Sequence, residues 1–243
     1  MSTVKSVPEA DAAISTPPSG TSRQEPRSLI EQAFQRLRAD ILHGRLPAGS
    51  KLPIDEIKAR YQVSGGTLRE ALSLLVSDGL VKAQAQRGFQ VAPMSLEDMR
   101  DLARTRVLLE GEAVRLSVQH GDVDWEARLV AAFHRLSLIE ERTMRDPVTY
   151  FEQWEQDNRA FHEALISACP SSWMLRFIGV LYVQMERYRR FTSTHNPPAR
   201  NVHDEHRALL DSALKRDATR CADMLRAHIE SSIDVAVHVG ALG

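Results

Sequence analysis

Three histidines and one asparagine have the clearest potential for chemistry in this chain. Asn158 and His162 stand four residues apart, so on a helix both side chains project from one face. His206 and His228 fall in two further segments with helical patterns. Imidazole nitrogens and an amide oxygen can bind a divalent metal such as Zn, Ni, Mn or Co, with open positions for water or a carboxylate. By spacing alone, unrelated polar histidines on helix surfaces are the more common explanation.

The same histidines could instead belong to a metal-dependent enzyme that acts on a small organic acid. The sequence lacks the familiar catalytic patterns, however. His162-Glu163 is followed by Ile166 at the position where a zinc-protease motif requires a second histidine. We find no Ser-His-Asp arrangement and no glycine-rich phosphate loop in the sequence. We therefore expect a protein that is not an enzyme, and the metalloenzyme stays as the alternative.

A second stretch, Val63 to Leu72, has the pattern of the turn and second helix of a helix-turn-helix. The hydroxyl of Ser64 can cap this helix. Apolar residues recur along one stripe, and Thr67 and Arg69 lie on another face. A recognition helix needs this division, because its first residues contact base edges while its back packs on the domain. An ordinary amphipathic surface helix has the same pattern, so the neighbouring segments must decide.

The neighbouring segments predict a winged helix-turn-helix with three helices and a two-stranded wing. A loop punctuated by Pro and Gly, which includes Arg45, follows the first helix. The tip of the wing carries Arg87 and Gly88, which can follow a minor groove or a phosphate. The helices are expected at 29–43, 55–61 and 64–78, and the strands at 80–83 and 89–91.

The remainder of the chain predicts only helices, joined by short connections that favour an antiparallel bundle. The fold class is therefore mostly α. We expect a disordered tail at 1–27, rich in Pro, Ser and Thr, a winged domain at 28–92 and an all-helical domain at 93–243. The six bundle helices are expected at 95–120, 125–144, 147–169, 173–191, 202–214 and 218–239.

The charge of the whole chain names no partner, since 31 Lys and Arg almost balance 32 Asp and Glu. The two parts differ: residues 28–92 carry nine basic against six acidic side chains, and residues 93–243 carry 19 against 23. A basic amino-terminal domain fits a DNA reader. Cys169 and Cys221 lack metal-type spacing and favour the reducing cytoplasm. No apolar run approaches the roughly 18 residues of a membrane span, so no membrane partner is expected.

Several motifs in combination resemble the GntR family of bacterial transcription regulators. They are Gly44 to Leu52, Val63-Ser64, Leu68 to Leu72, Asp78 to Val81 and Arg87 to Val91. The resemblance implies a transcription regulator, of repressor type, that controls a catabolic operon. Such a regulator binds a palindromic double-stranded DNA operator as a homodimer. It is cytoplasmic and associates with the nucleoid when it is bound to its operator. It places DNA contacts at Arg45, Ser64, Gly65, Gly66, Thr67, Arg69, Arg87 and Gly88. The family often has Arg and Pro where this chain has Gly65 and Thr67, so Gly65 offers a phosphate only its backbone N–H.

The carboxyl-terminal half resembles the FadR-type subfamily, whose helical effector domain is called the FCD domain. The matching pieces lie at 106–110, 158–162, 205–206 and 216–228. The resemblance implies a divalent metal (Zn, Ni, Mn or Co) held by Asn158, His162, His206 and His228, with Asn158 where many members have Asp. It also implies a small carboxylate effector near the metal, bound by Arg106 and Arg189. From its spacing alone, Arg106 could equally form an ion pair with Glu110 one turn later.

Overall fold

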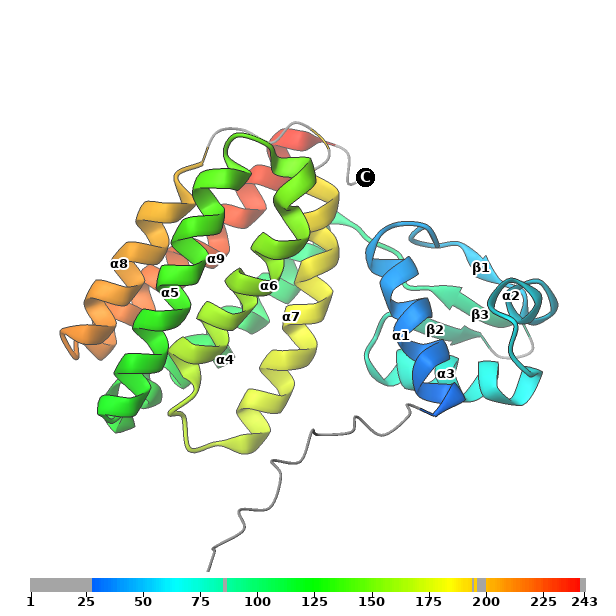
Figure 1. Ribbon diagram of the computed structural model, residues 1–243, viewed down its shortest axis with the longest axis horizontal. Helices are drawn as coiled ribbons and strands as arrows, with labels where there is room; N and C mark the ends of the chain where they lie inside the picture. The colour runs from blue at the N-terminus through cyan, green and yellow to red at the C-terminus, as the bar shows by residue number, and fades with distance from the viewer. Residues whose placement is uncertain (1–27, 85–86, 194, 196–199, 241–243) are drawn as a thin grey trace, which may run out of the picture.

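The computed structural model describes residues 28–84, 87–193, 195 and 200–240, and these residues form nine helices and three strands (Figure 1). The predicted disordered tail, 1–27, lies outside the described residues. A small group of three helices and a sheet lies beside a larger bundle of six helices. Within the described ranges, we find no helix with the length and apolar character needed to cross a membrane.

The small group is a winged helix-turn-helix, called here the winged domain, as the sequence predicts. The strands form one antiparallel sheet in the order β1-β3-β2, in which Gln90 of β3 pairs with Lys51 on one side and Lys82 on the other. Strand β1 corrects the prediction of a two-stranded sheet, because its two residues are too few to show an alternating pattern. The elements are α1 (Leu29–Leu42), β1 (Lys51–Leu52), α2 (Ile54–Tyr61), α3 (Gly65–Ser77), β2 (Val81–Gln84) and β3 (Gly88–Val91).

A turn and a side-chain cap fix the start of α3. Gln62 adopts the left-handed conformation, with φ 56°, and so ends α2 and redirects the chain. The hydroxyl of Ser64 accepts a hydrogen bond from the backbone N–H of Thr67 at 3.1 Å, which satisfies one unpaired donor of the first turn. Leu68 and Leu72 are completely buried. The apolar side of α3 therefore faces the core, and its first turn faces solvent.

The bundle contains the six helices that the sequence predicts. Its core includes Trp125, which is completely buried and whose indole N–H donates to the carbonyl of Ala164 at 2.9 Å, linking α5 to α6. Side-chain caps at Ser95, Asp122, Asp146, Asn201 and Asp217 begin five of the helices. The helices are α4 (Leu96–His120), α5 (Val123–Thr143), α6 (Pro147–Ile166), α7 (Ser172–Ser193), α8 (Val202–Leu214) and α9 (Ala218–Val239).

Helix α7 belongs to the bundle and also contacts the winged domain, where it lies beside α1 (Figure 1). Val183 is buried within the hydrophobic core of the winged domain. Gln184 donates to the backbone carbonyl of Asp78 and Arg187 to that of Ala92, both at 2.5 Å. Asp78 is the residue that caps the end of α3. One bundle helix therefore holds the last turn of the helix that carries the predicted DNA contacts.

Candidate metal centre and nucleic-acid interface

Three helices of the bundle bring three histidine rings together. His162 lies on α6, His206 on α8 and His228 on α9, and one ring nitrogen of each lies within 4.8 Å of the others. His206 has no exposed surface, and His162 is 4% exposed. The structure thus gathers three sequence-predicted metal ligands, from distant parts of the chain, at one point.

Carboxylates orient two of the three rings. Nδ1 of His206 lies 2.6 Å from Oε1 of Glu140 on α5, and Nδ1 of His228 lies 2.8 Å from Oε2 of Glu205 on α8. A carboxylate on one ring nitrogen leaves the other nitrogen as the ligand atom, as is usual around metals in proteins. Among the described residues, the buried Nε2 of His206 has no hydrogen-bond partner, which is costly unless something binds there. The donor set therefore fits a divalent metal.

The surroundings also favour the neutral form of the imidazoles. Burial lowers the pKa of His162 well below the usual histidine value, and the rings of His228 and His206 lower it further. Burial likewise lowers the pKa of His228, with further contributions from His206 and Arg200. A metal requires the lone pair of a neutral imidazole. Both rings are thus in their metal-binding form near neutral pH.

Asn158 lies one turn before His162 on α6. Its Nδ2 donates to the hydroxyl of Tyr182 on α7 at 2.6 Å, and both residues are buried. An amide group combines N–H donors with a carbonyl acceptor, so this bond orients the side chain and leaves the carbonyl oxygen as the ligand atom. Burial raises the pKa of Tyr182, so its hydroxyl stays protonated. The arrangement is compatible with Asn158 as a fourth, neutral ligand.

Two of the three histidines, His162 and His228, line a cavity of about 230 Å³ in the bundle together with Asn158. Ligand pockets usually span roughly 300–1,000 Å³, so this one suits a small molecule. Its other lining residues come from five helices and the segment before α8. They are Met99, Arg106, Phe151, Trp154, Met185, Arg189, Thr192, Ser193, Arg200, Val202, Ile229, Ser232 and Val235.

Both arginines predicted to bind an effector line this cavity, and a carboxylate holds each of them. Nε and Nη2 of Arg106 donate to Glu110 at 2.6 and 3.1 Å. Nε and Nη2 of Arg189 donate to Glu155 at 2.9 and 2.5 Å. Burial lowers the pKa of Arg189, but the charge and hydrogen bonds of Glu155, together with Tyr182 and Glu186, outweigh this effect and keep the pKa above the usual arginine value. In each pair the remaining nitrogen, Nη1, can donate to a ligand.

The start of α3 presents polar groups to solvent. Ser64, Gly66 and Arg69 are exposed, and Gly65 and Thr67 are half-buried. A Cβ atom at Gly65 would lie 3.6 Å from Nη1 of Arg69, so the guanidinium of Arg69 lies against the first residue of the helix. This places one strong donor beside the backbone N–H groups of a helix start, an arrangement that suits phosphates and base edges.

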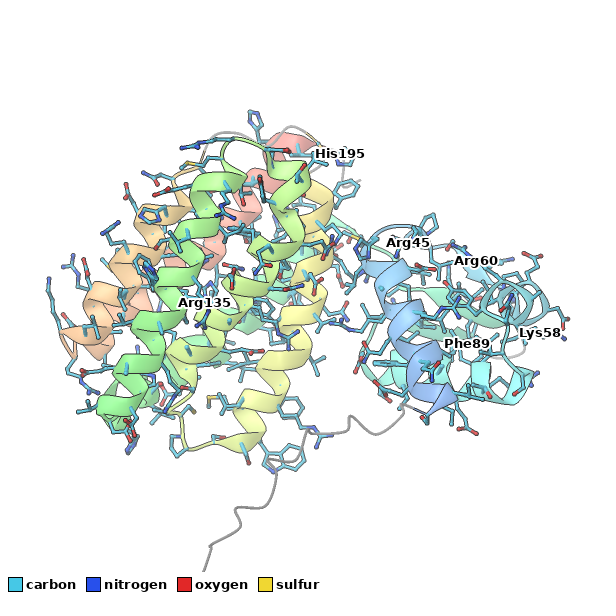
Figure 2. The ribbon with its side chains drawn as sticks, viewed as in Figure 1. Arg45, Lys58, Arg60, Phe89, Arg135 and His195 are labelled. Carbon is cyan, nitrogen blue, oxygen red and sulfur yellow. The ribbon has the colours of Figure 1, made fainter. Side chains whose placement is uncertain are left out.

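The wing and the loop after α1 contribute the other predicted DNA contacts. Arg87 and Gly88 are exposed, and Gly88 has a φ of 85°, which favours glycine. Nε of Arg45 lies 2.5 Å from Asp40, so this arginine is paired within its own domain. Figure 2 labels Arg45 together with Arg60, whose Nη2 lies 3.6 Å from the same aspartate. Residues 85 and 86 of the wing tip lie outside the described residues.

Sequence analysis did not identify the residues that support the metal ligands. One signal was present, since His203 and His206 stand three residues apart on one helix face. Nδ1 of His203 lies 2.8 Å from the second carboxylate oxygen of Glu140, so this glutamate binds both rings. The other supporting residues carry no local pattern, because their partners lie on different helices. The residues missed are Glu140, Tyr182, Arg200 and Glu205.

Comparison with known proteins matches both parts of the chain. Residues 29–91 match the family "Bacterial regulatory proteins, gntR family", and residues 101–231 match "FCD domain". The chain is 68% identical to the HTH-type transcriptional regulator BphR of Paraburkholderia xenovorans (strain LB400), over 89% of this chain and 88% of that protein. It is 31% identical to the HTH-type transcriptional repressor GlaR of Escherichia coli (strain K12), over 83% and 93%. Its fold is similar to that of E. coli McbR/YncC, with a TM-score of 0.71 at 23% identity over 88% of this chain and 99% of that one.

Proposed function

This chain belongs to the GntR family of DNA-binding transcription regulators and carries an FCD domain, and from this premise we propose a repressor whose operator binding responds to a small carboxylate at a metal centre. Its target is a catabolic operon, and it acts in the cytoplasm, on the nucleoid when bound to its operator. The proteins to which it is similar are named regulators and repressors, so the chain is a regulator and not a metal-dependent enzyme.

We assign DNA reading to the start of α3 and to the wing. Arg69 can donate to the edge of a guanine, and the N–H groups at the start of α3, including that of Gly65, can donate to a phosphate. Arg87 on the wing would contact the minor groove or the backbone. One winged domain offers a small surface, so two copies in a homodimer would bind the half-sites of a palindrome. Light scattering should show a dimer at micromolar concentration.

We assign the metal to His162, His206 and His228, with the carbonyl oxygen of Asn158 as a weaker ligand. Such a donor set suits Zn²⁺, Ni²⁺, Mn²⁺ or Co²⁺. When bound, the ion would supply a positive centre that attracts the effector carboxylate. The observation that carries this assignment is the convergence of three histidine rings, two of them buried and two held by carboxylates, beside a cavity that His162 and His228 line.

Helix α7 offers a physical connection between the two sites. Met185 and Arg189 line the cavity, whereas Val183 and Gln184 contact the winged domain. An effector that displaces α7 would therefore also displace the end of α3. Coupling between two such sites is typically worth about 1–3 kcal/mol, which is enough to release an operator.

The test joins metal content to operator release. The protein is purified without an affinity tag, its metal is measured by elemental analysis, and its footprint is mapped on the DNA upstream of its own gene. The complex is then titrated with small carboxylates, once with metal-loaded and once with chelator-treated protein. We expect release only from the metal-loaded protein. Equal release from the chelator-treated protein would remove the metal from the mechanism.

A further inference from the structure

We infer that the effector is a small monocarboxylate with an apolar body, and not a dicarboxylate. This inference rests on the proposed function, since it concerns the ligand of the same cavity. What decides the class of acid is the set of donors that the cavity still offers after its own hydrogen bonds are made. Among the described lining residues, the charged members of that set are arginines near the metal ligands.

Much of the cavity lining is apolar. Met99 and Met185 are almost completely buried, and Phe151 is 7% exposed. A hydrocarbon placed against such a wall leaves water at a gain in free energy, whereas a charged group there loses its hydration without a partner. The apolar lining residues, called here the apolar wall, are Met99, Phe151, Trp154, Met185, Val202, Ile229 and Val235. Among them, only Trp154 carries a side-chain donor, its indole N–H.

The three hydroxyl groups that line the cavity already use their protons. Thr192, Ser193 and Ser232 donate to backbone carbonyls three residues earlier in their own helices, at 3.0, 2.9 and 2.5 Å. A hydroxyl has a single proton, so each group can only accept a further hydrogen bond from a ligand. A carboxylate is acceptor-only and needs donors. These hydroxyls therefore do not favour a second carboxylate.

The arginines of the cavity are engaged as well. Arg106 and Arg189 hold Glu110 and Glu155, as described above. Arg200 donates to Glu205 at 2.8 and 2.5 Å, and to the backbone carbonyl of the His228 residue at 2.8 Å. Removing Arg106 or Arg189 from its buried glutamate would leave an uncompensated charge, which is strongly destabilising. A ligand can thus accept hydrogen bonds from the spare Nη1 atoms but cannot form a bidentate pair through Nε and Nη2.

The spare Nη1 groups belong to three arginines, Arg106, Arg189 and Arg200, that lie near the metal ligands. Nη2 of Arg200 lies 3.3 Å from Nδ1 of His228. The guanidinium carbons of Arg106 and Arg189 lie 5.6 and 4.5 Å from the centre of the Tyr182 ring. The hydroxyl of Tyr182 bonds Asn158, which neighbours His162. One carboxylate at the metal can therefore receive hydrogen bonds from these arginines, while the rest of the ligand meets the apolar wall. The cavity of about 230 Å³ limits that body to a small one.

A pair of acids with the same chain length tests this inference. Zn²⁺-loaded protein is titrated by calorimetry with pentanoate and with pentanedioate. Pentanoate ends in a methyl group where pentanedioate has a second carboxylate. We expect pentanoate to bind at least about tenfold more tightly, because the apolar wall offers the distal carboxylate no charged donor. Equal or tighter binding of pentanedioate would overturn the inference and leave a carboxylate-controlled repressor intact. Failure of both acids, and of the arylacetate phenylacetate, to bind would refute the carboxylate effector itself, and the inference with it.

A lysine added to the wall should change the preference. Val235→Lys places an ammonium group among the apolar residues, so the affinity ratio should move toward pentanedioate by about tenfold. Val237→Lys is the matched control, because Val237 is on the same helix, is 48% exposed and does not line the cavity. Thermal melting verifies that both variants fold. An unchanged ratio in a folded Val235→Lys protein would contradict the apolar wall.

Discussion

The predicted DNA-reading face and the metal centre differ in how their groups are prepared for a ligand. Ser64 and Arg69 lie on one short segment and are exposed, so they can contact DNA without rearranging a core. His206 is completely buried, comes from a different helix from the other ligands and is held by Glu140. When the contacts are independent, each substitution on the DNA-reading face should reduce operator affinity by a part. When several ligands hold one metal, the loss of a single ligand should abolish metal binding. Separate changes in each region should show this difference.

The largest effect is expected from His206→Ala. Two imidazoles and an amide are too few to hold a metal against competing buffer, so elemental analysis should find no stoichiometric metal. The response to effector should disappear, while operator binding should survive because the winged domain keeps its own core. His134→Ala is the control, since His134 is exposed on α5. Full effector response from a metal-free His206→Ala protein would break the comparison and leave Arg106 and Arg189 as the effector's anchors.

Arg69→Ala tests the other region. A bidentate arginine–guanine contact is worth about 1–3 kcal/mol, so operator affinity should fall roughly 5- to 150-fold at constant salt. Metal content should not change. Arg135→Ala serves as the control because Arg135 is exposed on α5 of the bundle (Figure 2). If Arg69→Ala binds the operator like the parent protein, α3 does not read DNA through this residue.

Glu140→Gln should weaken the metal centre without abolishing it. Removing the charge of a carboxylate that supports a metal-bound histidine typically costs 10- to 100-fold in metal affinity, and we expect a loss of about that size in competition with a chelator. Glu141→Gln is the neighbouring control, since Glu141 is exposed. Equal metal affinity in the two variants would show that Glu140 does not position His206.

The smallest effect is expected from Ser64→Ala. The hydroxyl caps α3, and loss of such a cap costs about 1 kcal/mol of the free energy of unfolding. Operator affinity should fall only modestly, which would support a face of independent contacts. Chemical denaturation measures the stability change, and Ser73→Ala, in the middle of α3, is the control. A loss of operator binding as large as that of Arg69→Ala would give Ser64 a direct contact with DNA.

Helix positions follow closely from the sequence where a buried stripe repeats over several turns. The prediction matches α8 (Val202–Leu214) and α9 (Ala218–Val239) at both ends, because Asn201 and Asp217 are recognisable caps. Strand β1 was missed, since two residues carry no periodicity. The histidines were found by residue type, but Glu140 was not, because its pairing with His206 exists only between folded helices. The sequence also did not predict that Val183 packs in the core of the winged domain, since that residue lies within a helix of the bundle.

The burial of Val183 in the winged domain has a consequence for biosynthesis. Synthesis proceeds from the amino terminus, so β3 is synthesised roughly 90 residues before Val183, a delay of about 5 to 20 s at ordinary elongation rates. During that time the nascent winged domain cannot fill the place that Val183 occupies. A ribosome-bound chain that ends before α7 should therefore be more sensitive to protease than the finished protein. The regulator completes its DNA-binding half only after much of its sensor half has been translated.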